Sequence, residues 1–405
     1  LSAGELSWLD WGGVLVTILL VVVYGLFFDR MLWGNKRIAA PLGVLLTAVL
    51  SMELCCNASV LFGSLDEEFG YDSRTSYLDF VERYRPAAQL VKRPADDFYR
   101  VENIDKRSAN DAMTLGYASI SHYSTTTYQR LNELLETLGH DLGTLNETRY
   151  SQNTIVSNAL LGIRYLLCEE YPEDAAAYRE VGQYGDVTVL ENPYALPLVF
   201  AADREALSTT WETTSSAFSL QNEIYSGLLG RETQILEPID WETEWEWGAR
   251  LEKEEGRYRL AADSLDSGWV SLSVRNPEEK PAYFRMPVAD GGTGSASLYY
   301  DGYYKQHYFT YRHNGVLPLR QTTEFSLSLW LHEPEIPLEG IEMAAVDLSE
   351  LAAATEILRA HAIDYEVVDN ARIVGQISVA EDQVVVTTIP YSAGWRATVD
   401  GQEAP

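Results

Sequence analysis

The longest apolar stretches of the chain lie near its start, in two runs. Residues 11–28, "WGGVLVTILLVVVYGLFF", hold 18 residues without a charge, and as a helix they extend about 27 Å, close to the hydrocarbon thickness of a bilayer. The second run, residues 38–60, is interrupted by Glu53. It spans a membrane only if that carboxylate lies at the interface or faces protein, and a buried or interfacial helix is the alternative. The pattern predicts a membrane α-helical hairpin within residues 1–63.

The short loop between the two runs, "DRMLWGNKR", carries three bases and one acid. Cytoplasmic loops of membrane proteins are enriched in Lys and Arg, so we expect this loop in the cytoplasm and residues 64–405 outside it. No small-residue cleavage site follows the first run, which argues against a secretory signal peptide.

Mixed patterns follow the hairpin. Residues 64–96 carry charges and scattered aromatics and read as a helical linker. In residues 97–201, strand-like stretches such as "FYRVENI" alternate with helical ones such as "YQRLNELLETLG", whose leucines recur at helical spacing. This alternation predicts a small α/β domain.

Residues 202–248 read as a linker with one helix and one unusual strand. In "WETEWEWG" the tryptophans Trp241, Trp245 and Trp247 alternate with glutamates. Strict period two predicts a strand with one aromatic face and one acidic face. We expect the aromatic face to pack between domains, with a sugar platform as the alternative.

The rest of the chain is rich in short strands. Residues 249–338 contain turn signals such as "RNPEEK" and "YYDGYY" between apolar stretches, which predict an antiparallel β-sandwich or jelly roll. Residues 339–405 read as a helix, "DLSELAAATEILRAHA", and a β-hairpin formed by "RIVGQISV" and "QVVVTTIP". We expect the chain to be truncated before a final membrane segment. The fold class is therefore a membrane hairpin plus an α+β extracytoplasmic region.

Charge limits the partners of the outer region. The formal net charge is -30, and most of the acids lie after residue 63. A surface of this sign repels nucleic acid and anionic headgroups, so we expect no nucleic-acid partner. The sequence gives no indication of the oligomeric state.

Metal and nucleophile motifs are missing from the sequence. It contains no CxxC, HExxH or GxSxG motif, and we predict no metal site. Cys55 or Cys56 could pair with Cys168, but buried thiols are the simpler expectation. We assign no catalytic residue.

One aromatic cluster is a candidate for carbohydrate contact. Residues 298–311, "LYYDGYYKQHYFTY", are rich in tyrosine, and tyrosines on a strand pair can stack on sugar rings and hydrogen-bond to hydroxyls. The alternative, which we favour, is a hairpin packed on its own sheet around an Asp-Gly turn. The contact candidates are Tyr300, Tyr303, Tyr304, His307 and Tyr308.

Several stretches resemble the YfhO family of bacterial polytopic membrane proteins. The most specific are "ENPYALP" (residues 191–197) and "PYSAGWRATVDG" (residues 390–401), and "ELCCNAS", "FYRVEN", "LLGIRYLL" and "SLQNEIYSGLLG" support them in the family's order. The resemblance implies a GT-C type glycosyltransferase-like protein that modifies a cell-envelope polymer of the lipoteichoic-acid type with sugar from a polyprenyl-phosphate donor.

The same resemblance implies that the catalytic acidic residue lies on an early outer loop, upstream of Leu1, so this fragment alone is expected to be inactive and to hold no cofactor. The expected partners are the lipid bilayer and a cell-envelope glycopolymer. The alternative function is a non-catalytic carbohydrate-binding or scaffolding domain that presents polymer to a partner transferase.

The family motifs themselves read as structural markers. We expect the prolines of "ENPYALP" to fix an extended edge, a sharp turn to form near residue 390, and an Asp-Gly turn to close the last strand, from Trp395 to Val399, which lacks one neighbour. These marker residues are Pro193, Pro197, Pro390, Gly394, Trp395, Asp400 and Gly401.

Overall fold

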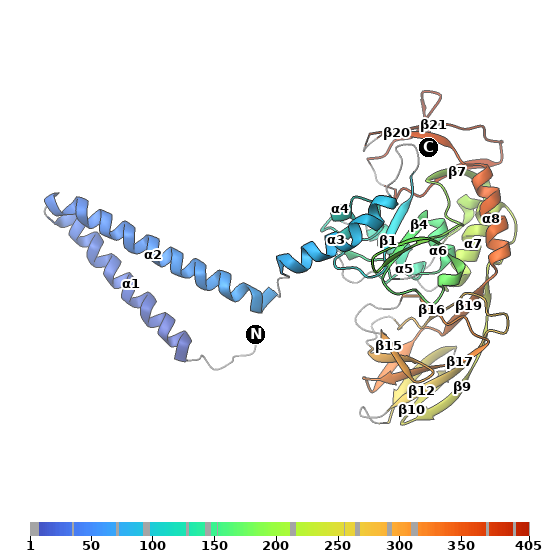
Figure 1. The fold of residues 1–405 in the computed structure, drawn as a ribbon, viewed down its shortest axis with the longest axis horizontal. Helices are drawn as coiled ribbons and strands as arrows, with labels where there is room; N and C mark the ends of the chain where they lie inside the picture. The colour runs from blue at the N-terminus through green and yellow to red at the C-terminus, as the bar shows by residue number, and fades with distance from the viewer. Residues whose placement is uncertain are drawn as a thin grey trace. The chain divides into compact units, whose positions relative to one another are not determined.

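The computed structural model describes residues 8–34, 36–69, 73–91, 98–126, 129–141, 147–151, 153–210, 216–254, 256–263, 268–289, 294–308, 315–369, 372–391 and 394–404. The chain divides into two compact units, Leu1–Tyr77 and Leu78–Pro405, and Figure 1 shows the elements of each.

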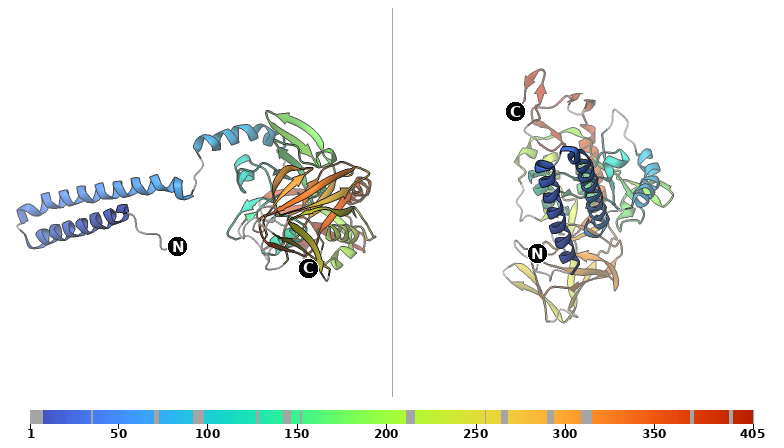
Figure 2. Two further views of the ribbon diagram at one scale, coloured as in Figure 1. Left: turned by 90° about the horizontal axis from the view of Figure 1, so that it is seen from below. Right: turned by 90° about the vertical axis from the view of Figure 1, so that its left-hand side faces the viewer.

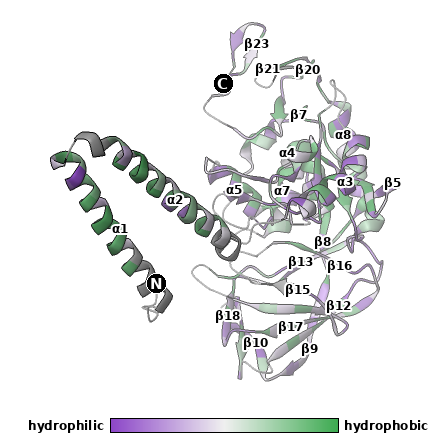
Figure 3. Ribbon diagram, turned by 60° about the vertical axis from the view of Figure 1, so that its left-hand side comes forward, coloured by the Kyte–Doolittle hydropathy of each residue, from purple (hydrophilic) through white to green (hydrophobic). Residues whose placement is uncertain are grey.

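The first unit contains two long helices, α1 (Trp8–Trp33) and α2 (Lys36–Phe69), which lie side by side in Figures 1 and 2. Their large apolar side chains are mostly exposed where the structure describes them, and both helices are largely green in Figure 3. Within the described residues, one segment, Ala40–Gly63, is long and apolar enough to cross a membrane. A second span over residues 11–28 stays a prediction.

Glu53 faces protein rather than standing alone in the candidate span. The hydroxyl of Tyr24 on α1 donates a hydrogen bond to the carboxylate of Glu53 on α2. A carboxylate without a partner is costly within hydrocarbon, so this bond explains how an otherwise apolar helix accommodates an acid.

The second unit begins with α3 (Arg74–Leu90), whose first residues still belong to the first unit. The first sheet of this unit has the strand order β1-β4-β6-β5. β1 (Arg100–Asn103) runs parallel to β4 (Ile163–Cys168), and β6 (Val187–Glu191) is antiparallel to β4 and to β5 (Arg179–Tyr184). Apolar side chains of α3 pack on this sheet. The region is therefore a mixed α/β structure.

Shorter elements complete this part. The helices begin at polar caps: the side chains of Thr154, Ser216 and Asp347 accept backbone N–H groups at the starts of α6, α7 and α8. These elements are α4 (Asp111–Leu115), β2 (His122–Tyr123), α5 (Gln129–Thr137), β3 (Glu147–Thr148), α6 (Ile155–Leu160), η1 (Ala175–Ala177), η2 (Arg204–Ser208), α7 (Ala217–Leu229) and α8 (Leu348–Ala360).

The prediction that "RIVGQISV" and "QVVVTTIP" pair as a hairpin is wrong, because each strand has another partner. β21 (Arg372–Gln376) pairs with β20 (Asp364–Asp369), whereas β22 (Gln383–Thr387) pairs with β7 (Val199–Asp203). The apolar residues of β7 are buried, and a strand far along the sequence supplies its partner. Local sequence proximity favoured the wrong pairing.

Three further sheets contain the strands between residues 236 and 346. A five-stranded sheet has the order β15-β14-β17-β12-β9, a three-stranded sheet β10-β11-β18, and a four-stranded sheet β16-β13-β19-β8. The strands of the five-stranded sheet are coloured yellow to orange in Figure 2 (left). The strands are β8 (Leu236–Pro238), β9 (Asp240–Trp247), β10 (Ala249–Glu254), β11 (Arg257–Ala262), β12 (Trp269–Arg275), β13 (Ala282–Arg285), β14 (Ala296–Tyr300), β15 (Tyr303–Tyr308), β16 (Leu317–Leu319), β17 (Glu324–Leu331), β18 (Glu335–Leu338) and β19 (Glu342–Val346).

The four-stranded sheet is buried on both faces. Tyr283 of β13 and Val346 of β19 belong to a core shared with α6, α7 and α8. Their sequence neighbours Phe284 and Ala345 belong to the core between the sheets of the sandwich. Successive residues of a strand point to opposite faces, so this one sheet joins the α/β part to the sandwich. The domain boundaries expected at residues 201, 248 and 338 stay predictions.

Candidate functional site

The five-stranded sheet has one buried and one solvent-facing side. On β12, Val270, Leu272 and Val274 are fully buried in the sandwich core. The alternate residues of the strand, from Trp269 to Arg275, point the other way. The core does not use this outward side.

Tryptophans occupy that outward side in a row across three strands. Trp247 of β9 is the register partner of Trp269 of β12, and Trp269 is the partner of Trp330 of β17. Their exposed fractions are 66%, 38% and 39%. A second row contains Trp245, exposed by 64%, and Tyr299 with Tyr304 at the far side of the sheet. We define the aromatic face as Trp245, Trp247, Trp269, Tyr299, Tyr304 and Trp330.

A β-bulge in β9 puts two tryptophans on this face. Thr243 pairs with Leu272 and Trp245 with Ser271, so Glu244 is an extra residue without a register partner. Trp241, before the bulge, pairs with Val274 and packs against the sandwich core. The expected single aromatic side of "WETEWEW" is therefore wrong, because an extra residue inverts the alternation of side chains.

Hydroxyl groups lie between the aromatic side chains. The Ser271 and Ser326 hydroxyls are 2.6 Å apart, and the Ser328 hydroxyl donates to Ser271 Oγ at 3.0 Å. Ser297 Oγ lies 2.8 Å from His332 Nε2. Ser271, Ser328 and Ser297 are themselves buried, so the face exposes mainly aromatic rings above a neutral polar floor.

The charged groups near the Arg275 end of the aromatic face, and on β15, are paired. Arg275 Nη2 donates to Glu242 at 2.6 Å, and its Nε lies 4.0 Å from Glu324. On β15, Lys305 is bonded to Glu173 at 2.8 Å.

The tyrosine candidates separate into different environments. Tyr300 is 1% exposed, its hydroxyl donates to the Pro318 carbonyl at 3.0 Å, and its ring meets the edge of Phe325. It lies in the core and is no longer a contact candidate. Tyr303 is 73% exposed beside the turn, and Tyr304 is 55% exposed with an edge-to-face contact to Tyr299.

The last two candidates lie at the far end of β15. The backbones of His307 and Tyr308 pair with Ser297 and Ala296, and their side chains lie outside the described residues.

The structural markers lie mostly in turns. Pro193 is in a turn where the Asn192 side chain accepts the Tyr194 N–H at 3.0 Å, rather than on an extended edge. Pro197 lies in the connection that precedes β7.

The Asp-Gly turn expected near residue 400 is confirmed. Asp400 and Gly401 have φ values of 53° and 80° and join β23 (Thr398–Val399) to β24 (Gln402–Glu403). The strand expected from Trp395 to Val399 is limited to Thr398 and Val399. Pro390, Gly394 and Trp395 flank residues 392–393, which lie outside the described part, so the turn expected there is not tested.

The cysteines are free: Cys55 and Cys56 are exposed, and Cys168 is buried. Burial raises the pKa of Cys168 to about 12, so its thiol stays protonated and unreactive at neutral pH. Among the described residues, no three His, Cys, Asp or Glu side chains gather as a metal ion would require.

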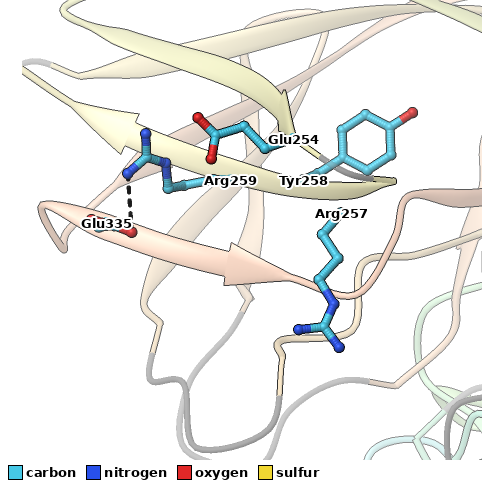
Figure 4. A pocket seen from close by; sticks show the side chains of 5 residues that line it. All are labelled: Glu254, Arg257, Tyr258, Arg259 and Glu335. Carbon is cyan, nitrogen blue, oxygen red and sulfur yellow. Dashed lines mark hydrogen bonds and ion pairs between the residues drawn. The ribbon is translucent and has the colours of Figure 1, made fainter.

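A pocket at the edge of the three-stranded sheet holds charged groups (Figure 4). It is lined by Glu254, Arg257, Tyr258, Arg259 and Glu335. Arg259 pairs with Glu252 and lies 3.4 Å from Glu335, and Arg257 lies 3.5 Å from Glu339. The two arginines are thus engaged with carboxylates, which favours an ion-pair network over an anion site.

Polar groups are also buried beside the first sheet. Glu102 accepts hydrogen bonds from the Ser119 hydroxyl at 2.8 Å, the Ile120 N–H at 2.6 Å and the Ser121 hydroxyl at 2.8 Å. Burial raises the pKa of Glu102 and lowers the pKa of His140 to about 3. Because three donors bind the carboxylate, this cluster holds residues 119–121, between α4 and β2, against β1.

Sequence reasoning missed Trp269 and Trp330. In "WVSLSVR" and "EFSLSLWL" each tryptophan shares its phase with the serines, not with the buried Val, Leu and Phe residues. That phase is the signal that could have identified them as outward-facing.

Comparisons with solved structures give distant matches to about a quarter of the chain. An exo-β-1,3-galactanase from Phanerochaete chrysosporium with bound β-1,3-galactotriose matches at 9% identity over 26% of this chain and 29% of that chain, with a TM-score of 0.20. A carbohydrate-binding module, CBM36, in complex with calcium and xylotriose matches at 16% identity over 26% of this chain and 98% of that chain, with a TM-score of 0.19. A salicylyl-acyltransferase from a tetracycline biosynthetic pathway matches at 12% identity over 27% and 39%, with a TM-score of 0.18. Scores this low carry no argument about fold or ligand.

Comparison with protein families gives a much longer match. No curated protein matches the chain, but the family model described as bacterial membrane protein YfhO matches residues 7–405. This range includes the helices of the first unit, the motifs "ENPYALP" and "PYSAGWRATVDG", and the whole aromatic face. The chain therefore belongs to the YfhO family of bacterial membrane proteins.

Proposed function

We propose that the second unit binds a cell-envelope glycopolymer at the aromatic face, outside the cytoplasmic membrane. The observation that carries this proposal is the row of Trp247, Trp269 and Trp330, exposed on a sheet whose other side is buried along β12, β14 and β17. Large exposed apolar surfaces with polar surroundings mark binding sites. Indole and phenol rings with nearby hydroxyls suit sugar rings, which have apolar faces and polar edges.

The location follows from the charges around the helices. Residues 29–37, which include the end of α1 and the start of α2, carry three bases and one acid, which favours the cytoplasm for this connection and the outer side for residues 64–405. The strong negative charge of the second unit would also be repelled by anionic headgroups.

The family resemblance supports a proposal for the reaction of the whole protein. We propose sugar transfer from a polyprenyl-phosphate donor to a polymer of the lipoteichoic-acid type, with the catalytic loop outside this chain. In this scheme the aromatic face holds the sugar-bearing part of the acceptor polymer. The alternative is a non-catalytic role, in which the same face presents polymer to a partner transferase.

The test uses the intact protein in the bacterium that encodes it. Strains carrying a gene deletion, the double variant Trp247→Ala/Trp330→Ala, or the distant control Trp395→Ala are compared for the sugar content of their envelope polymers by NMR. We expect deletion to remove a sugar substituent, the double variant to reduce it at unchanged protein level, and the control to behave as wild type.

Two outcomes separate the alternatives. If deletion lowers the sugar content but the purified intact protein binds polymer without transferring sugar from a polyprenyl-phosphate donor, the scaffold would replace the transferase. Equal polymer binding by wild type and the double variant would overturn the aromatic face as the contact surface.

A further inference from the structure

We infer that the aromatic face accepts an uncharged stretch of sugar rings that runs across the strands, and that it excludes polyanionic and phosphate-rich segments. This inference rests on the proposed function and names the chemistry of its ligand.

The direction follows from the strand register. Trp247, Trp269 and Trp330 are successive partners in β9, β12 and β17, and neighbouring strands lie about 4.8 Å apart. One sugar residue of an extended chain has a similar length. A chain laid across the strands therefore meets one tryptophan per sugar ring, whereas a chain laid along β12 or β17 meets a buried serine at the next outward position.

The second row is aromatic at its two ends and neutral between them. Ser271 and Ser328 lie between Trp245 on β9 and Tyr299 on β14, as successive register partners. Both serines are 2% exposed, and their hydroxyls lie 3.0 Å apart. They therefore form an uncharged floor beneath the rings, and the aromatic side chains make the ligand contacts.

The charge of the face argues against phosphate. Of the described Lys and Arg residues on the strands of this sheet, Arg275 lies between Glu242 and Glu324, and Lys305 is bonded to Glu173. Next to the sheet, Arg320 is bonded to Asp301 at 2.8 Å. A phosphate would have to displace a carboxylate from each of these cations, and the remaining acids would repel it.

The same charges disfavour an anionic membrane surface. Interfacial tryptophans bind membranes when basic residues accompany them, but the outward residues near Trp245 include Glu242 and Glu244. A membrane-bound face is therefore an outcome that the experiment must detect.

The experiment uses the full chain in neutral detergent and three probes: uncharged β-linked glucan hexaoses, poly(glycerol phosphate) of similar length, and vesicles containing anionic lipid. Binding is measured by calorimetry at low and high salt. We expect a glucan to bind with an affinity that salt does not change, and the other two probes not to bind. Trp269→Ala should weaken glucan binding at least about tenfold, while Trp395→Ala leaves it unchanged.

A charge variant sharpens the test. Glu242→Gln/Glu324→Gln leaves Arg275 without its two carboxylates while retaining all four tryptophans. We expect this variant to gain weak, salt-sensitive binding of poly(glycerol phosphate) and to keep its affinity for the glucan. This result would show that the ion pairs exclude the anion.

Failure of this inference can be distinguished from failure of the proposed function. If poly(glycerol phosphate) binds the wild type as tightly as the glucans and Trp269→Ala abolishes this binding, the uncharged-ligand inference falls and the proposed function survives. If no glycan binds, or if anionic vesicles bind through Trp269, both fall.

Discussion

Trp269 of β12 lies directly opposite Trp330 of β17, and both indoles are exposed although Val270 and Leu329 beside them are fully buried. On this strand pair, the outward-facing residues and the core-facing residues therefore serve different purposes. Trp269→Ala should change the free energy of unfolding by less than about 1 kcal/mol, as expected for an exposed side chain. Leu272→Ala, from the buried phase, should cost about 2–5 kcal/mol. Urea denaturation of both variants checks this difference, and equal losses would show that Trp269 is part of the core.

The bulge in β9 makes a prediction about chain length. Deleting Glu244 removes the extra residue, and strict alternation then still places Trp245 and Trp247 opposite in phase to Trp241. We expect this deletion to preserve glycan binding. Deleting Glu246 instead puts Trp247 out of phase with Trp245 and should weaken binding. Calorimetric titration of the two deletions checks the register, and the reverse order of affinities would contradict it.

Tyr300 and Tyr303 form a matched pair for stability. The Tyr300 hydroxyl is buried and bonded to the Pro318 carbonyl, whereas Tyr303 is the most exposed tyrosine of the cluster in the described residues. Tyr300→Phe should destabilise the fold by about 1–2 kcal/mol, because it leaves a carbonyl without its donor. Tyr303→Phe should have no measurable effect. Thermal denaturation of both variants checks this difference. A Tyr300→Phe protein as stable as the wild type would argue against the hydrogen bond.

Asp174 gives the second unit a pH dependence. It is buried, and its carboxylate accepts the Tyr283 hydroxyl at 2.5 Å. Burial raises its pKa to about 6 from an ordinary value of 3.8. The folded state therefore binds the extra proton, so this group favours folding below about pH 4, and that contribution is lost as the pH rises to about 6.

Asp174→Asn tests this assignment, because an amide keeps an acceptor for Tyr283 without a charge. The variant should be more stable than wild type at pH 7 by roughly 3 kcal/mol and should match it near pH 4. The difference between the two pH profiles of urea denaturation isolates Asp174 from the other acids. Parallel profiles would show that Asp174 does not titrate in this range.

The bond between Tyr24 and Glu53 should stabilise the helical pair of the first unit. Tyr24→Phe removes the donor, and we expect a loss of about 1 kcal/mol, typical of interhelical hydrogen bonds in membranes. Glu53→Gln keeps an acceptor and removes the charge, so it should lose less than Tyr24→Phe. Denaturation in mixed micelles measures both. A larger loss for Glu53→Gln would mean that the charge, not the bond, matters.

The sequence predicted elements better than partners. The helices that start after Ser216 and Asp347 follow from a capping residue and an apolar periodicity. Both signals depend only on residues that are close together in the sequence. The pairing of β22 with β7 joins segments some 180 positions apart, and no local pattern favours it over a hairpin with the preceding strand. Such pairings depend on which apolar faces remain to be covered when the whole unit packs.

The site shows the same limit. The phase of the serines indicates that Trp269 and Trp330 face outward, but only the strand order β17-β12-β9 brings them into one row with Trp247. The bulge at Glu244 depends on the register with β12 and inverts the expected side of Trp245. The density of tyrosines in residues 298–311 also put Tyr300 among the contact candidates, because composition does not show which tyrosine points into the core.

The four-stranded sheet with two buried faces also bears on how this unit can change in evolution. β13 gives Tyr283 to one core and Phe284 to the other, so removing either layer would expose to water the face of the sheet that this layer covers. The sandwich therefore cannot be exchanged between relatives by a simple crossover. New ligand preferences are expected to arise by substitution on its free face, while the α/β part and the sandwich are inherited together.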